Sequence, residues 1–465
     1  MADETAVLRE DLVRELEERL EAEQAIQRLP TLVVGLVRDG TLLWWGARGT
    51  TGIAGGRPPT AGTQYRIGSI SKTFTAVSVM RLRDEGVLHL SEPVGEHLHE
   101  LAGLPVTVAQ LLSHTSGLRA ETAGPWWERS PGVAFAELVS TSIRPEDLLW
   151  RPGRRFHYSN TGYAVLGELI SRKRSAPFGE VIRRDLLEPL GMNRTTLRPV
   201  APHAEGVAVH PHADLVLSEP EHDAAAMAPA GQLWSTIEDL VRWSDVIAGR
   251  RPEILGAESL GEMTEPLGLV DLPGQPWTSA YGLGLQLWNQ NGQRRYGHSG
   301  AMPGHWAMLV VEQATRDVVV AFANSTYSGL RPAFFEELLG VLAAQPRPRA
   351  PFRASPAAAG SPALELLGTW YWGPVEYRMN LGPEGRLELR GLSPGRDCNF
   401  RPNADGSYAG ETGYFAGERL ELRRRADGSL SHLDIASFAF TRSPYDPTAD
   451  IPGGLESGWR ADAPA

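Results

Sequence analysis

The sequence predicts an α/β (α+β) domain followed by a small all-β domain, and three observations support this fold class. Short apolar runs typical of strands lie near both ends of the first 344 residues, with helical patterns between them. This order predicts one mixed sheet assembled from both ends of the region. A Pro/Ala-rich stretch at 345–363 then predicts a linker. Beyond it, short apolar runs alternate with turns, which predicts a β-barrel or sandwich over 364–445 and leaves 446–465 as a tail.

The N-terminal segment, residues 1–29, contains a predicted amphipathic helix. Its apolar residues recur every four positions and form one stripe: Leu8, Leu12, Leu16 and Leu20. A partner protein or a membrane surface remains an alternative target, but the polar face is acidic, so we expect the helix to pack on its own domain. The apolar runs 32–37 and 42–45 then flank Asp39-Gly40 and predict a β-hairpin.

The main domain, residues 30–344, continues with helices and then with strands. Helices are predicted at 69–85, 108–113, 160–173, 177–190, 236–248 and 330–344. Strands are predicted at 281–288, 294–299, 305–312 and 317–323. In the second domain, Ala404-Asp-Gly406 and Ala426-Asp-Gly428 are turn signals between strands.

The composition excludes several classes of protein. Of the 465 residues, 42% are apolar and 22% charged, which is typical of a soluble globular protein. The net charge of −11 argues against a nucleic-acid partner, which would require a basic face. The single cysteine, Cys398, excludes an internal disulfide. No secretory signal and no apolar run approaching 18 residues is visible, so we expect a cytoplasmic protein without a membrane partner.

The tetrad Ser69-Ile70-Ser71-Lys72 is the strongest chemical signal. The chain has only two lysines and otherwise uses arginine, so an ammonium group that can lose its proton is rare in it. If Ser69 opens a helix, positions i and i+3 share one face and the lysine nitrogen lies beside the serine hydroxyl. Ser69 could then form an acyl-enzyme, with Lys72 as its base.

Three further segments accompany the tetrad. Tyr158-Ser-Asn160 precedes an apolar helix, His298-Ser299-Gly300 lies on a late strand, and His114-Thr-Ser-Gly-Leu118 lies between them and the tetrad. Tyr158 is a second candidate base, because a phenolate would be stabilised beside a lysine ammonium. The choice between Lys72 and Tyr158 stays open, since the two groups share protons.

With these motifs in this order, residues 30–340 resemble the serine β-lactamase and penicillin-binding-protein superfamily. The resemblance is strongest to its class C-related branch of D-aminopeptidases, carboxylesterases and D-Ala-D-Ala carboxypeptidases. It extends to further phrases of the sequence: Pro152-Gly153, Leu190-Gly-Met192, Pro229 to Thr236 and Tyr281-Gly-Leu-Gly284. It implies a β-lactamase/transpeptidase-like fold with a mainly antiparallel sheet, a lipocalin-like C-terminal domain and no cofactor.

The resemblance also implies roles for individual residues. Ser69 would be the nucleophile, and Lys72 and Tyr158 would activate it and then protonate the leaving group. The backbone N–H groups of Ser69 and Ala301 would hold the oxyanion. Asn160, and the third motif of His298, Ser299 and Gly300, would bind substrate. Class C β-lactamases have Lys-Thr-Gly at the third motif, and a neutral histidine there weakens the case for binding a carboxylate.

Other signals favour ordinary structural roles. His203, His210, His212 and His222 lie near several acidic residues, and His210 and His212 on a strand could chelate a metal. No recognised ligand spacing appears, so we predict a polar loop and no metal. Trp126-Trp127 could line an acyl pocket or anchor a loop. Neither a Gly-x-Ser-x-Gly elbow nor a phosphate-binding loop occurs.

We therefore expect a serine hydrolase or acyltransferase that forms an acyl-enzyme at Ser69 and acts on small peptides or esters that contain D-residues. A stand-alone penicillin-binding-protein-type thioesterase, which cyclises nonribosomal peptides delivered by a peptidyl carrier protein, is one alternative. The resemblance implies that such thioesterases share this catalytic domain and a lipocalin-like C-terminal domain. A β-lactamase or DD-carboxypeptidase is another. The last is a catalytically silent ligand-binding protein, which the joint presence of Ser69, Lys72 and Tyr158 disfavours.

Overall fold

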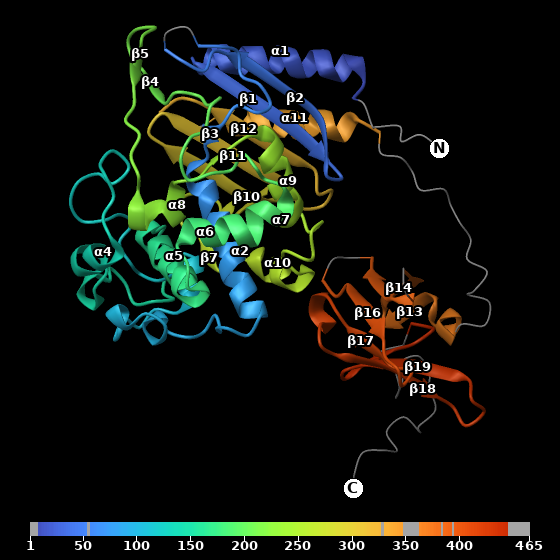
Figure 1. The fold of residues 1–465 in the computed structure, drawn as a ribbon. Helices are drawn as coiled ribbons and strands as arrows, with labels where there is room; N and C mark the ends of the chain where they lie inside the picture. The colour runs from blue at the N-terminus through green and yellow to red at the C-terminus, as the bar shows by residue number, and fades with distance from the viewer. Residues whose placement is uncertain are drawn as a thin grey trace. The chain divides into compact units, whose positions relative to one another are not determined.

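The computed structural model describes residues 8–53, 56–326, 330–346, 362–382, 385–392 and 395–444. The chain divides into two compact units, residues 1–347 and 348–465 (Figure 1). Most of the predicted linker at 345–363, all of the tail at 446–465 and residues 1–7 lie outside the described residues.

The first unit is built on an eight-stranded sheet in which every neighbouring pair of strands is antiparallel. Its strand order is β2-β1-β12-β11-β10-β9-β8-β7, so the N-terminal hairpin pairs with the last strand of the unit. The strands are β1 Thr31–Arg38, β2 Thr41–Gly49, β7 Gly268–Leu269, β8 Ser279–Tyr281, β9 Gln286–Gln290, β10 Gln293–Met302, β11 His305–Glu312 and β12 Val318–Ala323. The assembly of one sheet from both ends of the region is confirmed, but the prediction of a mixed sheet is wrong, because every neighbouring pair of strands is antiparallel.

Helices cover both faces of this sheet (Figure 1). All eight residues of β1 are buried, because successive side chains point to opposite faces and both faces are covered. Leu32 and Val34 join a core with α1 (Glu10–Ile26) and α11 (Pro332–Ala344). Val33 joins the larger core on the opposite face.

The N-terminal helix packs on its own unit, as predicted. Leu12, Leu16 and Leu20 of α1 are buried in the core that α1 shares with α11. Within the part of the chain that the structure describes, no helix is long and apolar enough to cross a membrane.

The opposite face of the sheet carries the helices that position the sequence motifs described above. They are α2 Ser71–Asp84, α3 Val108–Leu112, α4 Phe135–Ser142, α5 Asn160–Arg174, α6 Phe178–Ile182, α7 Glu188–Leu190, α8 Ala228–Gly231, α9 Ile237–Ile247 and α10 Ala257–Met263. The unit also contains two small antiparallel two-stranded sheets: β3 Tyr65–Arg66 with β6 Trp234–Ser235, and β4 Val207–Val209 with β5 Val216–Ser218.

Three details differ from the sequence-based expectation. The strand predicted at 281–288 is wrong, because Gly284 takes a left-handed φ of +87° and splits it into β8 and β9. The helix predicted at 177–190 is interrupted by a π-turn at Arg183–Leu187. Helices α4, α8 and α10 are short, with four to eight residues, and gave too little periodicity to be predicted.

The second unit is an eight-stranded antiparallel sheet in which each strand pairs with the next, from β13 to β20. The strands are β13 Gly368–Trp372, β14 Val375–Leu381, β15 Leu387–Gly391, β16 Cys398–Pro402, β17 Tyr408–Gly410, β18 Arg419–Arg424, β19 Leu430–Ile435 and β20 Phe438–Phe440. An antiparallel bridge between Tyr371 and Thr441 joins the first strand to the end of the last, so the sheet forms a near-barrel. Its core contains Trp370, Phe400 and the buried Cys398.

Candidate active site

A tight turn places Ser69 directly before α2. Gly68 has a left-handed φ of +51°, and a Cβ there would lie 2.5 Å from the Ala301 nitrogen, so glycine is required for this close approach. Ser69 itself lies in a 3-10 turn, Gly68–Ile70, rather than in the helix as predicted. Lys72 lies in the first turn of α2, three residues after Ser69, and its Nζ still lies 2.9 Å from Ser69 Oγ.

Lys72 is fully buried and its amino nitrogen has three oxygen neighbours. Besides Ser69 Oγ, Nζ donates to Asn160 Oδ1 at 2.7 Å and to the Ala230 carbonyl at 2.7 Å. Among the described residues, no carboxylate forms a hydrogen bond or ion pair with it. Burial lowers the pKa of Lys72 from 10.5 to about 7, while the charges of Glu121 and Glu128 act in the opposite direction. Its ammonium can therefore lose a proton near neutral pH.

Tyr158 lies at the end of the loop that leads into α5. Its ring centroid is 4.9 Å from Lys72 Nζ, and its hydroxyl shares a hydrogen bond with Ser69. Burial raises the pKa of Tyr158 well above its ordinary value of 10.0, an effect that the hydrogen bond with Ser69 only partly offsets. Tyr158 is accordingly a phenol at neutral pH, which favours Lys72 over Tyr158 as the group that accepts a proton from Ser69.

Asn160 is the first residue of α5 and connects Lys72 to an acidic side chain. Its Oδ1 accepts from Lys72, and its Nδ2 donates to Glu121 Oε1 at 2.7 Å. The other oxygen of Glu121 accepts from Trp127 Nε1 at 2.7 Å. One hydrogen of the Asn160 amide remains for a substrate carbonyl, so the predicted role of Asn160 in substrate binding stays a prediction.

The end of β10 passes across the turn that contains Ser69. A Cβ on Gly300 would lie 3.0 Å from the Ser69 nitrogen, so the two backbones are in close contact. The Ser299 N–H donates to Gln286 Oε1 on the β9 side of β10. N–H groups two residues apart on a strand point to the same side, and the Ala301 N–H therefore faces this side too. The predicted pair of oxyanion donors, Ser69 and Ala301, is thus brought together.

His298 differs from its expected part in substrate binding. Its side chain is fully buried, and Nε2 forms a hydrogen bond of 2.7 Å with the hydroxyl of Tyr281. Burial lowers the pKa of His298 to about 3, so the imidazole is neutral, as the sequence indicated. The Ser299 hydroxyl donates to Gln286 Oε1. The third motif therefore supplies no cation for a substrate carboxylate.

The structure gathers every predicted site residue at one place and adds three residues to which the sequence analysis gave no role: Glu121, Tyr281 and His114. Glu121 was missed because no motif contains it, and Tyr281 because its Tyr-Gly-Leu-Gly phrase carried no chemical assignment. His114 belonged to a recognised phrase but had no role. Contacts among residues this distant in sequence leave no periodic signal, so sequence reasoning had no means to find Glu121.

The other candidates have ordinary structural roles. His210 lies in the loop between β4 and β5, as the predicted polar loop requires, and the described residues contain no group of His, Cys, Asp and Glu that could hold a metal ion. Trp127 is buried and anchors its loop through Glu121, whereas Trp126 is exposed and donates to Glu128 Oε2.

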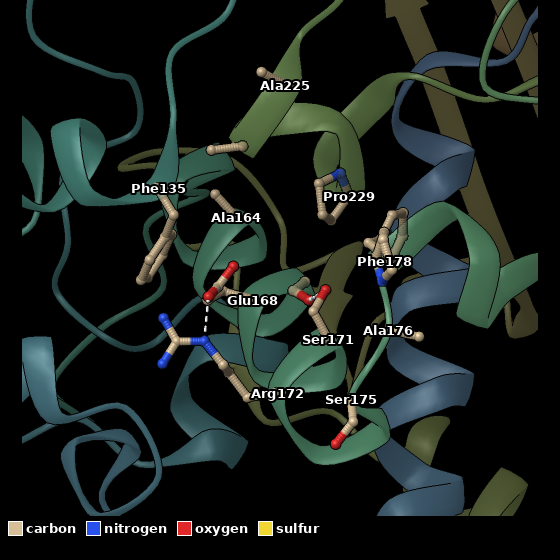
Figure 2. Close-up of a pocket in the computed structure, with 13 residues that line it drawn as sticks. Phe135, Ala164, Glu168, Ser171, Arg172, Ser175, Ala176, Phe178, Ala225 and Pro229 are labelled. Carbon is tan, nitrogen blue, oxygen red and sulfur yellow. Dashed lines mark hydrogen bonds and ion pairs between the residues drawn. The ribbon is translucent and has the colours of Figure 1, made fainter.

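A separate cavity of about 540 Å³ lies between α5, α6 and α8 (Figure 2). Phe135, Ala164, Phe178 and Pro229 supply its apolar lining, and the ion pair between Glu168 and Arg172 lies at its edge. None of Ser69, Lys72 and Tyr158 lines it.

An α/β unit that brings a serine, a buried lysine and a tyrosine together beside two converging N–H groups is typical of serine hydrolases that form acyl-enzymes. The chain belongs to the beta-lactamase family: the family model described as "Beta-lactamase" matches residues 13–339. A second model, described as a domain of unknown function (DUF7586), matches residues 359–442.

Comparison with individual proteins gives the same family. The chain is 27% identical to Penicillin-binding protein 4 of Amycolatopsis lactamdurans, over 70% of this chain and 89% of that protein. Among solved structures, it is similar to the D-stereospecific amidohydrolase from Streptomyces sp., with 25% identity, a TM-score of 0.58 and coverage of 72% of this chain and 99% of that chain. The D-amino acid amidase from Ochrobactrum anthropi SV3, complexed with L-phenylalanine, gives 25% identity, a TM-score of 0.61 and coverage of 71% and 98%.

Proposed function

We propose that this protein is a serine acyl hydrolase that forms an acyl-enzyme at Ser69 on small amides, esters or peptides with a D-configured aminoacyl group. The observation that carries the proposal is the environment of Lys72 Nζ. A neutral amine has two N–H donors and one lone pair. Asn160 Oδ1 and the Ala230 carbonyl can only accept, so they hold the two N–H groups. The lone pair then points to Ser69 Oγ.

The reaction follows from this arrangement. Lys72 takes the proton of the Ser69 hydroxyl as Oγ bonds to the substrate carbonyl carbon. The N–H groups of Ser69 and Ala301 stabilise the negative oxygen that forms. When the bond to the leaving group breaks, that group takes a proton from the hydroxyl of Tyr158, which recovers one from the Lys72 ammonium. Water then attacks the acyl-enzyme by the same proton transfers in reverse.

The charges around the site support a substrate with a free amino group. Glu121 and Glu128 both lie close enough to Lys72 to raise its pKa, and burial raises the pKa of Glu128 itself. The neutral His298 provides no compensating cation. A substrate ammonium is therefore favoured near Ser69 and a carboxylate is disfavoured. The names of the two similar amidohydrolases agree with an aminoacyl substrate of D configuration.

A stereochemical comparison of amides tests this proposal. Wild type and Ser69→Ala are incubated with D-phenylalanine amide, L-phenylalanine amide and N-acetyl-D-phenylalanine amide, and the products are measured by mass spectrometry. We expect wild type to hydrolyse the D-amide fastest, to lose most of its rate on the acetylated amide, and Ser69→Ala to be inactive. Equal rates with the two enantiomers would reject the D preference, and equal rates with Ser69→Ala would reject the mechanism.

A second candidate, the peptide-cyclising thioesterase, is favoured by the second unit. The resemblance drawn from the sequence associates that activity with a lipocalin-like C-terminal domain, and the second unit is an eight-stranded antiparallel near-barrel. Incubation with a linear peptidyl thioester that has a free amine and a C-terminal D-residue distinguishes the two activities. A cyclic product made by wild type and not by Ser69→Ala would favour the thioesterase, whereas linear acid alone would favour the hydrolase.

A further inference from the structure

His114 holds the backbone on both sides of Tyr158. The carbonyl of His114 accepts from the His157 N–H at 2.8 Å, and its ring atom Nδ1 accepts from the Ser159 N–H at 3.0 Å. One residue in the loop after α3 thus fixes the two N–H groups that flank Tyr158 in the chain. The carbonyl of Ala120 accepts from the Asn160 N–H at 2.8 Å, so the backbone at the start of α5 is also held by a hydrogen bond.

The imidazole of His114 also packs directly on the phenol ring of Tyr158. The two ring centroids are 4.1 Å apart with an interplanar angle of 32°. On another side the imidazole meets the ring of Tyr281 at 4.4 Å, and Tyr281 in turn is bonded to His298. The imidazole that packs on Tyr158 is therefore itself held by the ring of Tyr281.

His114 is not itself suited to proton transfer. Since Nδ1 accepts a hydrogen bond, the proton of the neutral ring is on Nε2. Burial lowers the pKa of His114 well below its ordinary value, so the ring stays neutral. Nε2 is buried and has no hydrogen-bond partner among the described residues, and neither ring nitrogen bonds to Ser69 or Lys72.

Two features of His114 are unfavourable for stability. Its φ is +56°, a left-handed conformation that costs free energy for a residue with a Cβ. Its buried N–H has no hydrogen-bond partner among the described residues, and a buried donor that is left unpaired costs free energy. Unfavourable features of this kind concentrate at functional sites, where the surrounding structure holds them in place.

We propose that His114 is a positioning residue of the acyl-transfer reaction, which sets the Tyr158 hydroxyl against Ser69 by holding the two backbone N–H groups beside Tyr158 and packing on its ring. The proposal rests on the proposed function, because it acts through Tyr158. It gives a physical role to the His-Thr-Ser-Gly-Leu phrase that begins at His114.

A double-mutant cycle tests the proposal, with the rate of Ser69 labelling by D-phenylalanine methyl ester, measured by rapid acid quenching and peptide mass spectrometry, as the readout. The proteins are wild type, His114→Ala, Tyr158→Phe and the double variant, each with its melting temperature measured. We expect Tyr158→Phe to slow labelling by about 100-fold, a typical contribution of a proton-transferring side chain. We expect His114→Ala to slow it by about 30-fold and the double variant to be within about threefold of Tyr158→Phe, since the two residues act as a unit.

His114→Asn is the conservative control. Asparagine tolerates left-handed backbone, and its Oδ1 occupies the place of the histidine Nδ1, so the hydrogen bond from Ser159 is kept while the ring is lost. We expect it to label faster than His114→Ala.

Each outcome of the cycle decides the question. If the double variant loses labelling rate by the product of the two single-variant losses, the positioning role is overturned and the proposed function stays intact. A failure of Tyr158→Phe to slow labelling would contradict the proposed mechanism itself. If His114→Ala does not fold, the cycle is run with His114→Asn, and the same two criteria apply to it.

Discussion

The rate of Ser69 acylation should follow the ionisation of a lysine whose pKa is about 7. At pH 7.5 a lysine of ordinary pKa is only ~0.1% neutral, whereas one with a pKa near 7 is ~75% neutral, a gain of ~750-fold in the active base. Lowering the pKa from 10.5 to about 7 corresponds to about 5 kcal/mol of unfavourable burial of the ammonium. That free energy arises because the side chain is fully buried and, in the part of the chain that the structure describes, has no carboxylate as a hydrogen-bond or ion-pair partner.

The assay is fluorophosphonate labelling of Ser69 between pH 5 and 9. The wild-type rate should rise about tenfold per pH unit at low pH and level off above about pH 7. Lys72→Arg should label about 1000-fold more slowly, with no break near pH 7, because a guanidinium keeps its proton. A wild-type profile that still rises with unchanged slope at pH 9, or a Lys72→Arg variant of near-normal rate, would refute the reasoning.

The same ionisation predicts how stability depends on pH. The pKa of Lys72 is lower in the folded state than in the unfolded state, so between about pH 7 and pH 10.5 the unfolded chain binds more protons at this site. The contribution of Lys72 to the free energy of unfolding therefore rises with pH in this window. Denaturant unfolding of wild type and Lys72→Met across the window should show the difference, wild type minus variant, increasing with pH; a flat difference would contradict the low pKa.

Three further predictions follow from individual contacts. Glu121→Gln removes a charge that raises the pKa of Lys72 but keeps an acceptor for Asn160, so the pH at which the labelling rate levels off should fall below that of wild type. The control Glu137→Gln, at an exposed position, should leave that pH unchanged. A rise of that pH in Glu121→Gln would contradict the electrostatic argument. Gly300→Ala would place a Cβ 1.9 Å from the Ile67 carbonyl and should reduce amide hydrolysis at least ~100-fold by displacing an oxyanion donor, whereas Gly340→Ala, with no atom within 4 Å of the new Cβ, should keep full activity. Leu16→Ala in the fully buried stripe of α1 should lower the free energy of unfolding by about 3 kcal/mol in denaturant titration, and a loss under about 1 kcal/mol would show that α1 is not part of the core.

Much of the fold could be predicted from the sequence, because the spacing of apolar residues in long segments indicates whether they form a helix or a strand. The hairpin around Asp39-Gly40, helix α5 and strand β11 lie where their patterns place them. The error at 281–288 has a local cause, since only the packing of Gly284 against Ala76 on α2 shows why the chain turns there: a Cβ would lie 2.1 Å from that side chain. Short helices such as α8 depend on tertiary contacts that no window of sequence records.

The candidate site was predictable as a set of residues but not as an electrostatic environment. Spacing alone put Lys72 beside Ser69, and the contact of 2.9 Å agrees with it. Whether Lys72 or Tyr158 takes the proton depends on burial, which the sequence does not give. The buried hydrogen bond between His298 and Tyr281 likewise joins two motifs whose contact the sequence does not indicate.

The proposed function requires an acyl-enzyme formed between Ser69 and a D-aminoacyl group. The most direct test is rapid acid quenching of wild type with D-phenylalanine methyl ester, followed by peptide mass spectrometry. We expect one phenylalanyl group on the peptide that contains Ser69. The amount of this adduct should be much smaller with the L-ester, and Ser69→Ala should form none. An adduct on a different peptide, or full turnover of the ester by Ser69→Ala, would contradict the proposed function.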